Sequence, residues 1–284
     1  MTRQDGQTRS HRTQVFYASR AGSVNLRRLR YAARGGMLKP LLRRVFENLG
    51  RPADLDAAAG YDLWSSTYDS EKDNLLVALD ERVFAAMLPR VPLQGKRVVD
   101  IGCGTGRHWG TLLARQPAEL VGYDLSPCML AELRRKYPRA TVHQAGADRL
   151  VHAEDNGFGV VVSTLTLCHL PALDAALGEW VRVLRPGGDL LLTDFHPAAS
   201  AMSQCSFRHE GRSFTVKLYV HSLASLEAAA ARNGLELLAL EETTVDESTR
   251  AYYERAGMLR SFERMKGLPL VYGAHFRKPD RASP

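Results

Sequence analysis

The sequence predicts a doubly wound α/β fold, in which helices cover both faces of a mostly parallel sheet. An apolar run ends at Val99, glycines crowd the turn at residues 100–106, and a helical stretch begins at Trp109. Residues 158–163 form an unbroken apolar run, which is typical of a strand buried on both faces. Candidate strands and helices alternate between and beyond these points, and that alternation is the order that builds a parallel sheet.

The first half of the chain supplies the elements around the glycine turn. Apolar residues at helical spacing predict the helix that precedes the turn, and Pro89 closes it. Pro127 stands at the first position of a later helix, where its missing N–H is harmless. The expected elements are a helix over 74–87, a strand ending at 99, a helix over 109–115, a strand ending at 124, a helix over 128–136 and a strand over 140–144.

The second half continues the alternation but contains two interruptions. Arg185-Pro186-Gly187-Gly188 ends a helix and turns the chain back into the sheet, and Ser222 and Gly234 bound a later helix. Residues 198–218 and 243–267 do not follow the pattern, so we expect them to form cap insertions over the strand ends. The expected regular elements are a helix over 172–184, a strand over 189–195, a helix over 222–234, a strand over 235–241 and a strand over 269–278.

The glycine turn predicts a nucleotide site, because glycines bring a ligand close to bare backbone and a helix N-terminus follows. The spacing excludes a P-loop, and Arg107 stands where a dinucleotide fingerprint needs Gly or Ala. Asp100 adds a carboxylate that would repel a pyrophosphate but could bind an ammonium group. Asp100-x-Gly102-x-Gly104-x-Gly106 resembles the first motif of class I S-adenosylmethionine-dependent methyltransferases.

Further motifs strengthen this resemblance, which runs from about Tyr61 to Lys278. A second strand ends in Asp124 eighteen residues after Gly106, and Leu184-Arg-Pro-Gly-Gly188 also matches the family. The chain is most similar to the small-molecule branch that includes ubiquinone- and menaquinone-type (type 11) methyltransferases. The resemblance implies a Rossmann-like, seven-stranded, mostly parallel sheet with an antiparallel last strand, together with S-adenosyl-L-methionine as cofactor.

The resemblance also implies cofactor-binding residues. The repeated Tyr-Asp at residues 61–69 matches the lid element of this branch in position and spacing, and two aromatics packed on one helix face are the alternative explanation. The family's adenine-binding Asp is replaced by Gly146, so the nearby Asp148 or the backbone of Ala147 is expected to substitute. The expected contacts are Asp100, Gly102, Cys103, Gly104 and Gly106 for the amino-acid end, Asp124 for the ribose, Leu125, Ala147 and Asp148 for the adenine, Thr164 and Leu165 near the sulfonium, and Tyr61 and Tyr68 in the lid.

Three histidines are candidate substrate-facing groups. An oxygen or nitrogen acceptor usually loses a proton, and histidine suits that exchange near neutral pH. His169 and His196 follow predicted strand ends, and His221 follows the first cap insertion. A lone histidine is more often structural than catalytic, so each assignment competes with a packing role. The remaining histidines and the four scattered cysteines show no ligand spacing, which argues against a metal.

The N-terminal segment holds the positive charge of the chain. Residues 1–50 contain ten arginines and one lysine against two acids, a net charge of +9, whereas the whole chain of 284 residues has +7. Residues 1–23 are polar and aperiodic and are expected to be mobile. Apolar residues from Leu38 to Leu49 predict an amphipathic helix. A helix docked on the domain or on a second subunit, a surface for anionic lipid or nucleic acid, and an organelle presequence are the three interpretations.

We therefore expect a basic extension at residues 1–55 and a methyltransferase domain at 56–279. The expected function is methyl transfer from S-adenosylmethionine to an O-, N- or C-atom of a small metabolite. The alternatives are an RNA methyltransferase that uses the basic arm, quinone methylation at a membrane surface, and a non-catalytic cofactor-binding protein. No apolar run reaches the roughly 18 residues of a membrane span, and no signal peptide is evident, so a cytoplasmic protein is expected.

Overall fold

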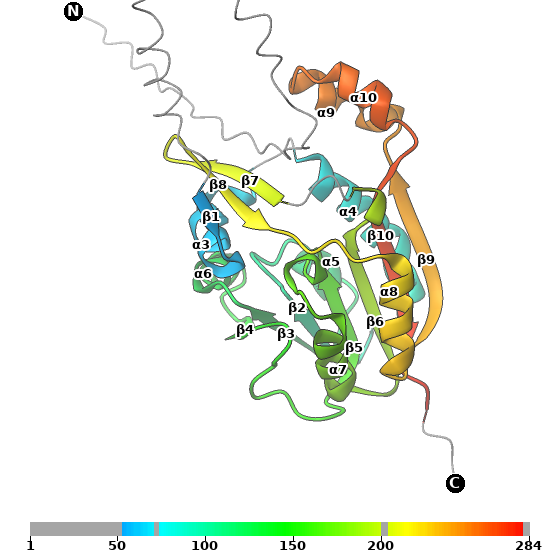
Figure 1. Ribbon diagram of the computed structural model, residues 1–284. Helices are drawn as coiled ribbons and strands as arrows, with labels where there is room; N and C mark the ends of the chain where they lie inside the picture. Colours follow the sequence, from blue (N-terminus) through cyan, green and yellow to red (C-terminus); the bar gives the residue numbers. More distant parts are fainter. Residues whose placement is uncertain (1–52, 71–73, 200–203, 281–284) are drawn as a thin grey trace, which may run out of the picture.

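A seven-stranded sheet forms the centre of the computed structural model, which describes residues 53–70, 74–199 and 204–280 (Figure 1). The strand order is β4-β3-β2-β5-β6-β10-β9, and every pair is parallel except the two that β10 makes. The strands are β2 (Arg97–Ile101), β3 (Glu119–Asp124), β4 (Thr141–Gln144), β5 (Phe158–Thr164), β6 (Leu184–Phe195), β9 (Glu236–Thr244) and β10 (Pro269–Arg277). The predicted fold class and the antiparallel last strand are confirmed.

Two hydrophobic cores separate the sheet from helices on its opposite faces. Side chains alternate along a strand, so Val98 and Val160 pack into one core while Val99 and Val161 pack into the other. The first core also holds side chains of α4 (Leu75–Met87), α5 (Trp109–Leu113) and α6 (Pro127–Lys136). The second holds those of α7 (Leu173–Val183) and α8 (Leu223–Arg232), which lie in front of the sheet in Figure 1.

A second, three-stranded sheet lies beside the first. Its strands are β1 (Ala53–Leu55), β7 (Gln204–His209) and β8 (Arg212–Lys217), in the order β1-β8-β7. The insertion expected at 198–218 thus contains a β-hairpin after a short helix, η3 (Pro197–Ala199). The sequence pattern did not predict β1. This strand lies in the expected N-terminal extension, yet it pairs in parallel with β8.

The helix α3 (Ala57–Tyr68) packs under this small sheet (Figure 1). A Cβ atom on Gly60 would lie only 2.3 Å from a methyl carbon of Val216, so this helix approaches β8 as closely as a glycine permits. The ring of Trp64 stacks on Phe207 of β7 at a centroid distance of 5.2 Å. These contacts fix α3 against the hairpin.

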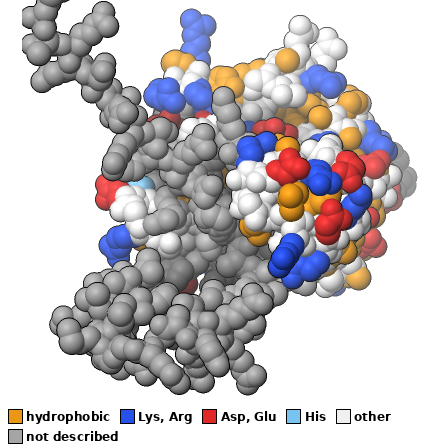
Figure 2. All heavy atoms as spheres, turned by 90° about the horizontal axis from the view of Figure 1, so that it is seen from above, with side chains coloured by type: hydrophobic (Ala, Val, Ile, Leu, Met, Phe, Trp, Pro, Cys, Tyr) orange, Lys and Arg blue, Asp and Glu red, His pale blue; other side chains and the backbone are white. Residues whose placement is uncertain are grey.

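The second interruption, residues 243–267, is mostly helical, and none of its residues lines the cavity described below. It contains the end of β9, a short helix η4 (Glu247–Thr249), α9 (Arg250–Arg255) and α10 (Leu259–Met265). Tyr253 and Phe262 join the two helices through rings 5.6 Å apart. Seen from above, the described side chains over this piece carry both signs of charge intermixed (Figure 2).

Element ends differ from the expected ones by a few residues. The helix α5 ends at Leu113 instead of residue 115, and β6 begins at Leu184, so Pro186 and Gly187 belong to the strand instead of preceding it. The amphipathic helix predicted from Leu38 to Leu49, the mobile segment at 1–23 and any dimer contact through that helix lie outside the described residues. Over the described ranges, no helix has the length and apolar character needed to cross a membrane.

Candidate functional site

The glycine turn after β2 forms the floor of a cavity. Gly102 and Gly104 have φ values of +72° and +52°, a conformation that side chains rarely adopt. A Cβ atom on Gly102 would lie 2.1 Å from Oγ1 of Thr166, which is impossible without movement. The turn therefore requires glycine at position 102 for close packing as well as for backbone conformation.

Asp124, the last residue of β3, lies beside this turn. Its Oδ2 accepts a hydrogen bond from the backbone N–H of Gly104, and its Oδ1 accepts one from the N–H of Ser126, both at 2.8 Å. Burial raises the pKa of Asp124, while these backbone N–H groups oppose the rise. A carboxylate oxygen has more than one acceptor position, so each oxygen retains capacity for a ligand hydroxyl.

A cavity of about 360 Å³ opens between the turn, the strand ends and α3. This volume falls within the range of roughly 300–1,000 Å³ that is usual for small-molecule sites. The lining is mostly apolar. The lining residues are Ala57, Ala58, Tyr61, Tyr68, Gly102, Gly104, Asp124, Leu125, Ser126, Met129, Ala145, Gly146, Ala147, Asp148, Thr164, Leu165, Thr166, His169 and Leu170.

Most of the sequence-predicted cofactor residues meet at this cavity. Two glycines of the turn, Asp124, Leu125, Ala147, Asp148, Thr164, Leu165 and both lid tyrosines are among the lining residues. Leu165 has a φ of +50° and donates its N–H to the carbonyl of Thr193, so a strained residue turns the chain into the site. Sequence reasoning did not identify Thr166, although its contact with Gly102 shapes the turn.

Three predicted residues of the motif lie behind the cavity instead of lining it. Asp100 is 4% exposed, and its Oδ2 accepts a hydrogen bond from the indole N–H of Trp109 at 2.9 Å. Burial raises the pKa of Asp100 to about 7. The Cys103 thiol faces Gly122, and Gly106 lies against Leu133, so both residues pack the turn against its neighbours.

The tyrosines and the aspartates of the repeated Tyr-Asp have different roles. Tyr61 and Tyr68 line the cavity, whereas the two aspartates fasten the helix to the rest of the domain. Asp62 accepts hydrogen bonds from the Ser126 hydroxyl at 2.5 Å and from the Cys128 N–H at 3.2 Å.

The second aspartate of the repeat holds the other end of the helix. Asp69, which follows the last residue of α3, accepts from the Thr105 hydroxyl at 2.6 Å and pairs with Lys136 at 2.7 Å. The spacing of the repeat places both carboxylates against α6 and the glycine turn.

His169 also lines the cavity. Its Nε2 lies 2.9 Å from the Tyr61 hydroxyl, and its enclosed Nδ1 has no hydrogen-bond partner in the described part of the chain. Burial lowers the pKa of His169 to about 4. The ring is therefore neutral near pH 7.

The other two candidate histidines have different partners and are not among the lining residues. His196 pairs through Nε2 with Glu242 at 2.7 Å, and its Nδ1 accepts from the N–H of Ala198 at 3.0 Å. The Nε2 of His221 lies 2.8 Å from the carbonyl oxygen of Leu170 and donates to it. Both histidines join the segments after their strands to neighbouring elements.

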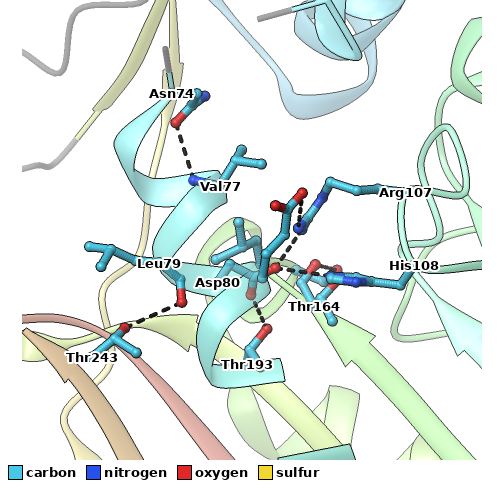
Figure 3. A network of polar contacts seen from close by, with 12 residues as sticks. Asn74, Val77, Leu79, Asp80, Arg107, His108, Thr164, Thr193 and Thr243 are labelled. Atoms are coloured by element: carbon cyan, nitrogen blue, oxygen red, sulfur yellow. Dashed lines mark hydrogen bonds and ion pairs between the residues drawn. The ribbon is translucent and has the colours of Figure 1, made fainter. Parts of the chain in front are cut away.

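A buried ionic cluster connects α4 to the residues that follow the glycine turn. The sequence pattern did not predict it. Arg107 and His108 from the turn and Thr193 from β6 converge on Asp80, which is fully buried (Figure 3). Arg107 Nη2 and His108 Nε2 lie 2.5 and 3.0 Å from Oδ2. These partners hold the pKa of Asp80 below its usual value despite burial, whereas burial lowers the pKa of His108. Among the described residues, no group of histidine, cysteine and acidic side chains suitable for a metal occurs.

The residues around the cavity fit an adenosyl cofactor. Asp124 presents acceptors suited to a ribose diol, bare glycine backbone lies beside it, and Leu125 and Met129 contribute apolar lining of the kind that a flat base requires. The fold and this cavity define a nucleotide-binding α/β domain with its site at the carboxyl ends of parallel strands.

Comparisons with known proteins agree with this class. Residues 99–192 match the family described as "Methyltransferase domain". An uncharacterized methyltransferase of Emericella nidulans is 29% identical over 245 residues, covering 73% of this chain and 85% of that protein. The demethylmenaquinone methyltransferase of Chlorobaculum parvum is 35% identical over 133 residues, 45% of this chain and 55% of that protein. The chain thus spans only about half the length of the second relative.

A solved structure supports the same fold. The S-adenosylmethionine-dependent methyltransferase of Mesorhizobium loti superposes with a TM-score of 0.55 and 21% identity, covering 72% of this chain and all of that one. Residues 99–192 thus resemble a methyltransferase domain, the chain is similar in sequence to methyltransferases, and its fold is that of a solved S-adenosylmethionine-dependent methyltransferase.

Proposed function

We propose that the protein transfers a methyl group from S-adenosylmethionine to a small organic acceptor, with the cofactor held in the cavity under α3. The observation that carries this proposal is Asp124, whose two oxygens are fixed by backbone N–H groups while the carboxylate faces the cavity. When bound, the cofactor supplies an electrophilic methyl group on a sulfonium sulfur.

Each end of the cofactor has candidate partners in the cavity. Asp124 is proposed to bind the ribose hydroxyls and Leu125 to cover one face of the adenine. Asp148, an exposed residue at the rim, or the backbone of Ala147 is proposed to receive the adenine amino group. Asp100 lies behind the cavity, where its carboxylate accepts a hydrogen bond from the indole of Trp109. It is therefore proposed to influence the amino-acid end of the cofactor through the glycine turn and not by direct contact.

The lid helix is proposed to exclude water from the methionine end. Tyr61 and Tyr68 contribute two rings from α3, and burial raises the pKa of Tyr68 to about 12, so that phenol stays un-ionised. Displacing water from a methyl-transfer site lowers the cost of aligning acceptor and methyl group. Asp62 and Asp69 hold the lid over this end.

Isothermal calorimetry with S-adenosylmethionine tests the cofactor assignment directly. Incubation with methyl-labelled cofactor and a metabolite extract, followed by identification of the labelled product, tests transfer to a small acceptor. Absence of binding heat together with absence of any labelled product would overturn the proposal. Label recovered in RNA instead of a metabolite would replace the small acceptor with a nucleic acid.

A further inference from the structure

The wall loop, residues 164–170, forms one side of the cavity where β5 ends. It includes the short helix η2 (Leu167–His169), and Leu165 within it has a φ of +50°. A residue in such a strained conformation keeps it only where the surrounding structure holds the chain in place. The loop residues that line the cavity are Thr164, Leu165, Thr166, His169 and Leu170. The shape of this side of the cavity therefore depends on what holds the loop.

Two neighbouring segments hold the wall loop by hydrogen bonds to its backbone. On β6, the carbonyl of Thr193 accepts from the N–H of Leu165 at 2.9 Å. In the segment after the hairpin, the N–H of Tyr219 donates to the carbonyl of Cys168 at 2.6 Å, and the ring of His221 donates to the last residue of the loop at 2.8 Å. The N–H of Cys168, in the second half of the loop, has a different kind of partner.

The partner of the Cys168 N–H is the carboxylate of Asp194, the last residue but one of β6. Oδ2 of Asp194 accepts this N–H at 2.8 Å, and Oδ1 accepts the N–H of Phe195 at 2.6 Å. Asp194 is only 3% exposed, so bulk water cannot replace either bond. This side chain therefore ties the wall loop to the sheet from a dry position behind the cavity.

We infer that Asp194 is a positioning residue for methyl transfer, whose carboxylate holds the wall loop in the conformation that presents His169 and Leu170 to the methyl acceptor. This inference rests on the proposed function. The partners proposed above for the ribose and the adenine come from the ends of β3 and β4, which leaves the wall loop for the methyl group and its acceptor. Asp194 is not among the lining residues, so it acts through the loop and not by contact with a reactant.

An ionised carboxylate suits this position better than a neutral group of the same shape. Both oxygens of a carboxylate accept hydrogen bonds, whereas a protonated carboxyl or an amide presents a donor at one of the two positions. At Asp194 an N–H group already points at each oxygen, so a neutral side chain would bring two donors face to face. An unmatched buried donor costs free energy, and a shift of the loop is the way to separate the two.

Burial makes the charge of Asp194 sensitive to pH. It raises the pKa of Asp194 to about 7, while the N–H groups of Phe195 and Cys168 oppose the rise. The ionisable groups that face this carboxylate are the Cys168 thiol on the loop, Asp80 on α4 and Tyr272 on β10. Burial raises the pKa of the thiol and of the phenol, and the pKa of Asp80 is held below its usual value, so Asp194 is the member of this group that titrates near neutrality. The loop should be held above this pH and released below it.

NMR of the full-length protein with ¹⁵N-labelled cysteine tests the contact without cofactor or acceptor. The chain has four cysteines, and Cys168→Ser identifies the amide signal of Cys168 by its loss. This signal should shift with a midpoint near pH 7, because the carboxylate that accepts the N–H changes charge there. Asp194→Asn is the control and should abolish the shift. A signal of the natural chain that stays constant over about two pH units on either side of that midpoint would overturn the inference.

A second experiment measures methyl transfer with methyl-labelled S-adenosylmethionine and a metabolite extract. Asp194→Asn should bind the cofactor within about threefold of the natural chain in calorimetry, yet form labelled product roughly 10- to 100-fold more slowly, the effect of a small misplacement of reacting groups. The rate of the natural chain should fall as the pH drops below 7, whereas the variant should be slow on both sides of that pH. Asp174→Asn, at an exposed position on α7, is the control and should change neither quantity.

The outcomes separate this inference from the proposed function. A full rate in Asp194→Asn would contradict the positioning role. If circular dichroism shows that this variant does not fold, the natural chain decides: the rate and the Cys168 signal should share one midpoint, and different midpoints would overturn the inference. If the natural protein binds no cofactor in calorimetry, the proposed function fails, whereas the titration of the Cys168 amide still reports on the contact with Asp194.

Discussion

Gly102→Ala should destabilise the domain strongly, and the structure gives the magnitude. The new methyl group would lie 2.1 Å from Oγ1 and 2.7 Å from Cγ2 of Thr166, at a residue with φ of +72°. The left-handed conformation costs a non-glycine residue roughly 1–2 kcal/mol, and overpacking of this kind costs roughly 1–3 kcal/mol. The free energy of unfolding should therefore fall by about 2–5 kcal/mol.

Gly104→Ala is the matched comparison, because Gly104 also has a positive φ but a Cβ atom there would meet nothing within 4 Å. It should lose only the conformational share of about 1–2 kcal/mol. Thermal unfolding separates the two variants, since each kcal/mol shifts the Tm of a domain this size by roughly 2–4 °C. If Gly102→Ala is no less stable than Gly104→Ala, the contact with Thr166 is not as described.

Three further changes test the cofactor site, the buried cluster and the histidine. Asp124→Ala should weaken S-adenosylmethionine binding in calorimetry by roughly 1.5–3 kcal/mol, or about 10- to 150-fold in Kd, and Asp148→Ala by less; equal losses would remove the ribose assignment. Asp80→Ala should lower the free energy of urea unfolding by about 3–5 kcal/mol, because Arg107 is left charged in the core, and a loss near zero would show that this cluster is dispensable. The pKa of His169 is about 4 in the folded protein, against 6.5 ordinarily. At a pH between these values, the ring is protonated in the unfolded chain and neutral in the folded chain. The contribution of this ring to the free energy of unfolding is full above pH 6.5 and falls by up to about 3 kcal/mol as the pH is lowered towards 4. The His169→Gln variant should lack this pH-dependent loss. If the free energy of unfolding has the same pH dependence in both proteins, the prediction is wrong.

Local sequence signals predicted the sheet well because its strands obey simple patterns. The run at 158–163 and the turn at 100–106 each follow from residue type, and the antiparallel β10 followed from the family resemblance. The strand β1 could not be predicted in the same way. It has three residues, and the strand with which it pairs, β8, lies more than 150 positions away.

The candidate site was predictable at residues whose type and position both match a sequence motif. Asp124 and the lid tyrosines stand at positions that the motifs define, and the structure brings them to one cavity. Histidine partners were not predictable, since sequence position alone could not distinguish His169, which lines the cavity, from His196, which pairs with Glu242. Asp80 is one acid in an otherwise ordinary amphipathic helix, so only the packed structure reveals its partners.

Ser126 performs three tasks within a few ångströms. Its N–H holds Asp124, its hydroxyl donates to Asp62 of the lid helix, and the same oxygen accepts from the N–H of Met129 to cap α6. A swing of α3 away from the strand ends would break the Asp62 contact but leave the Asp124 contact intact. With the cofactor bound as proposed, such a swing would uncover its methionine end while the carboxylate proposed for the ribose stays fixed.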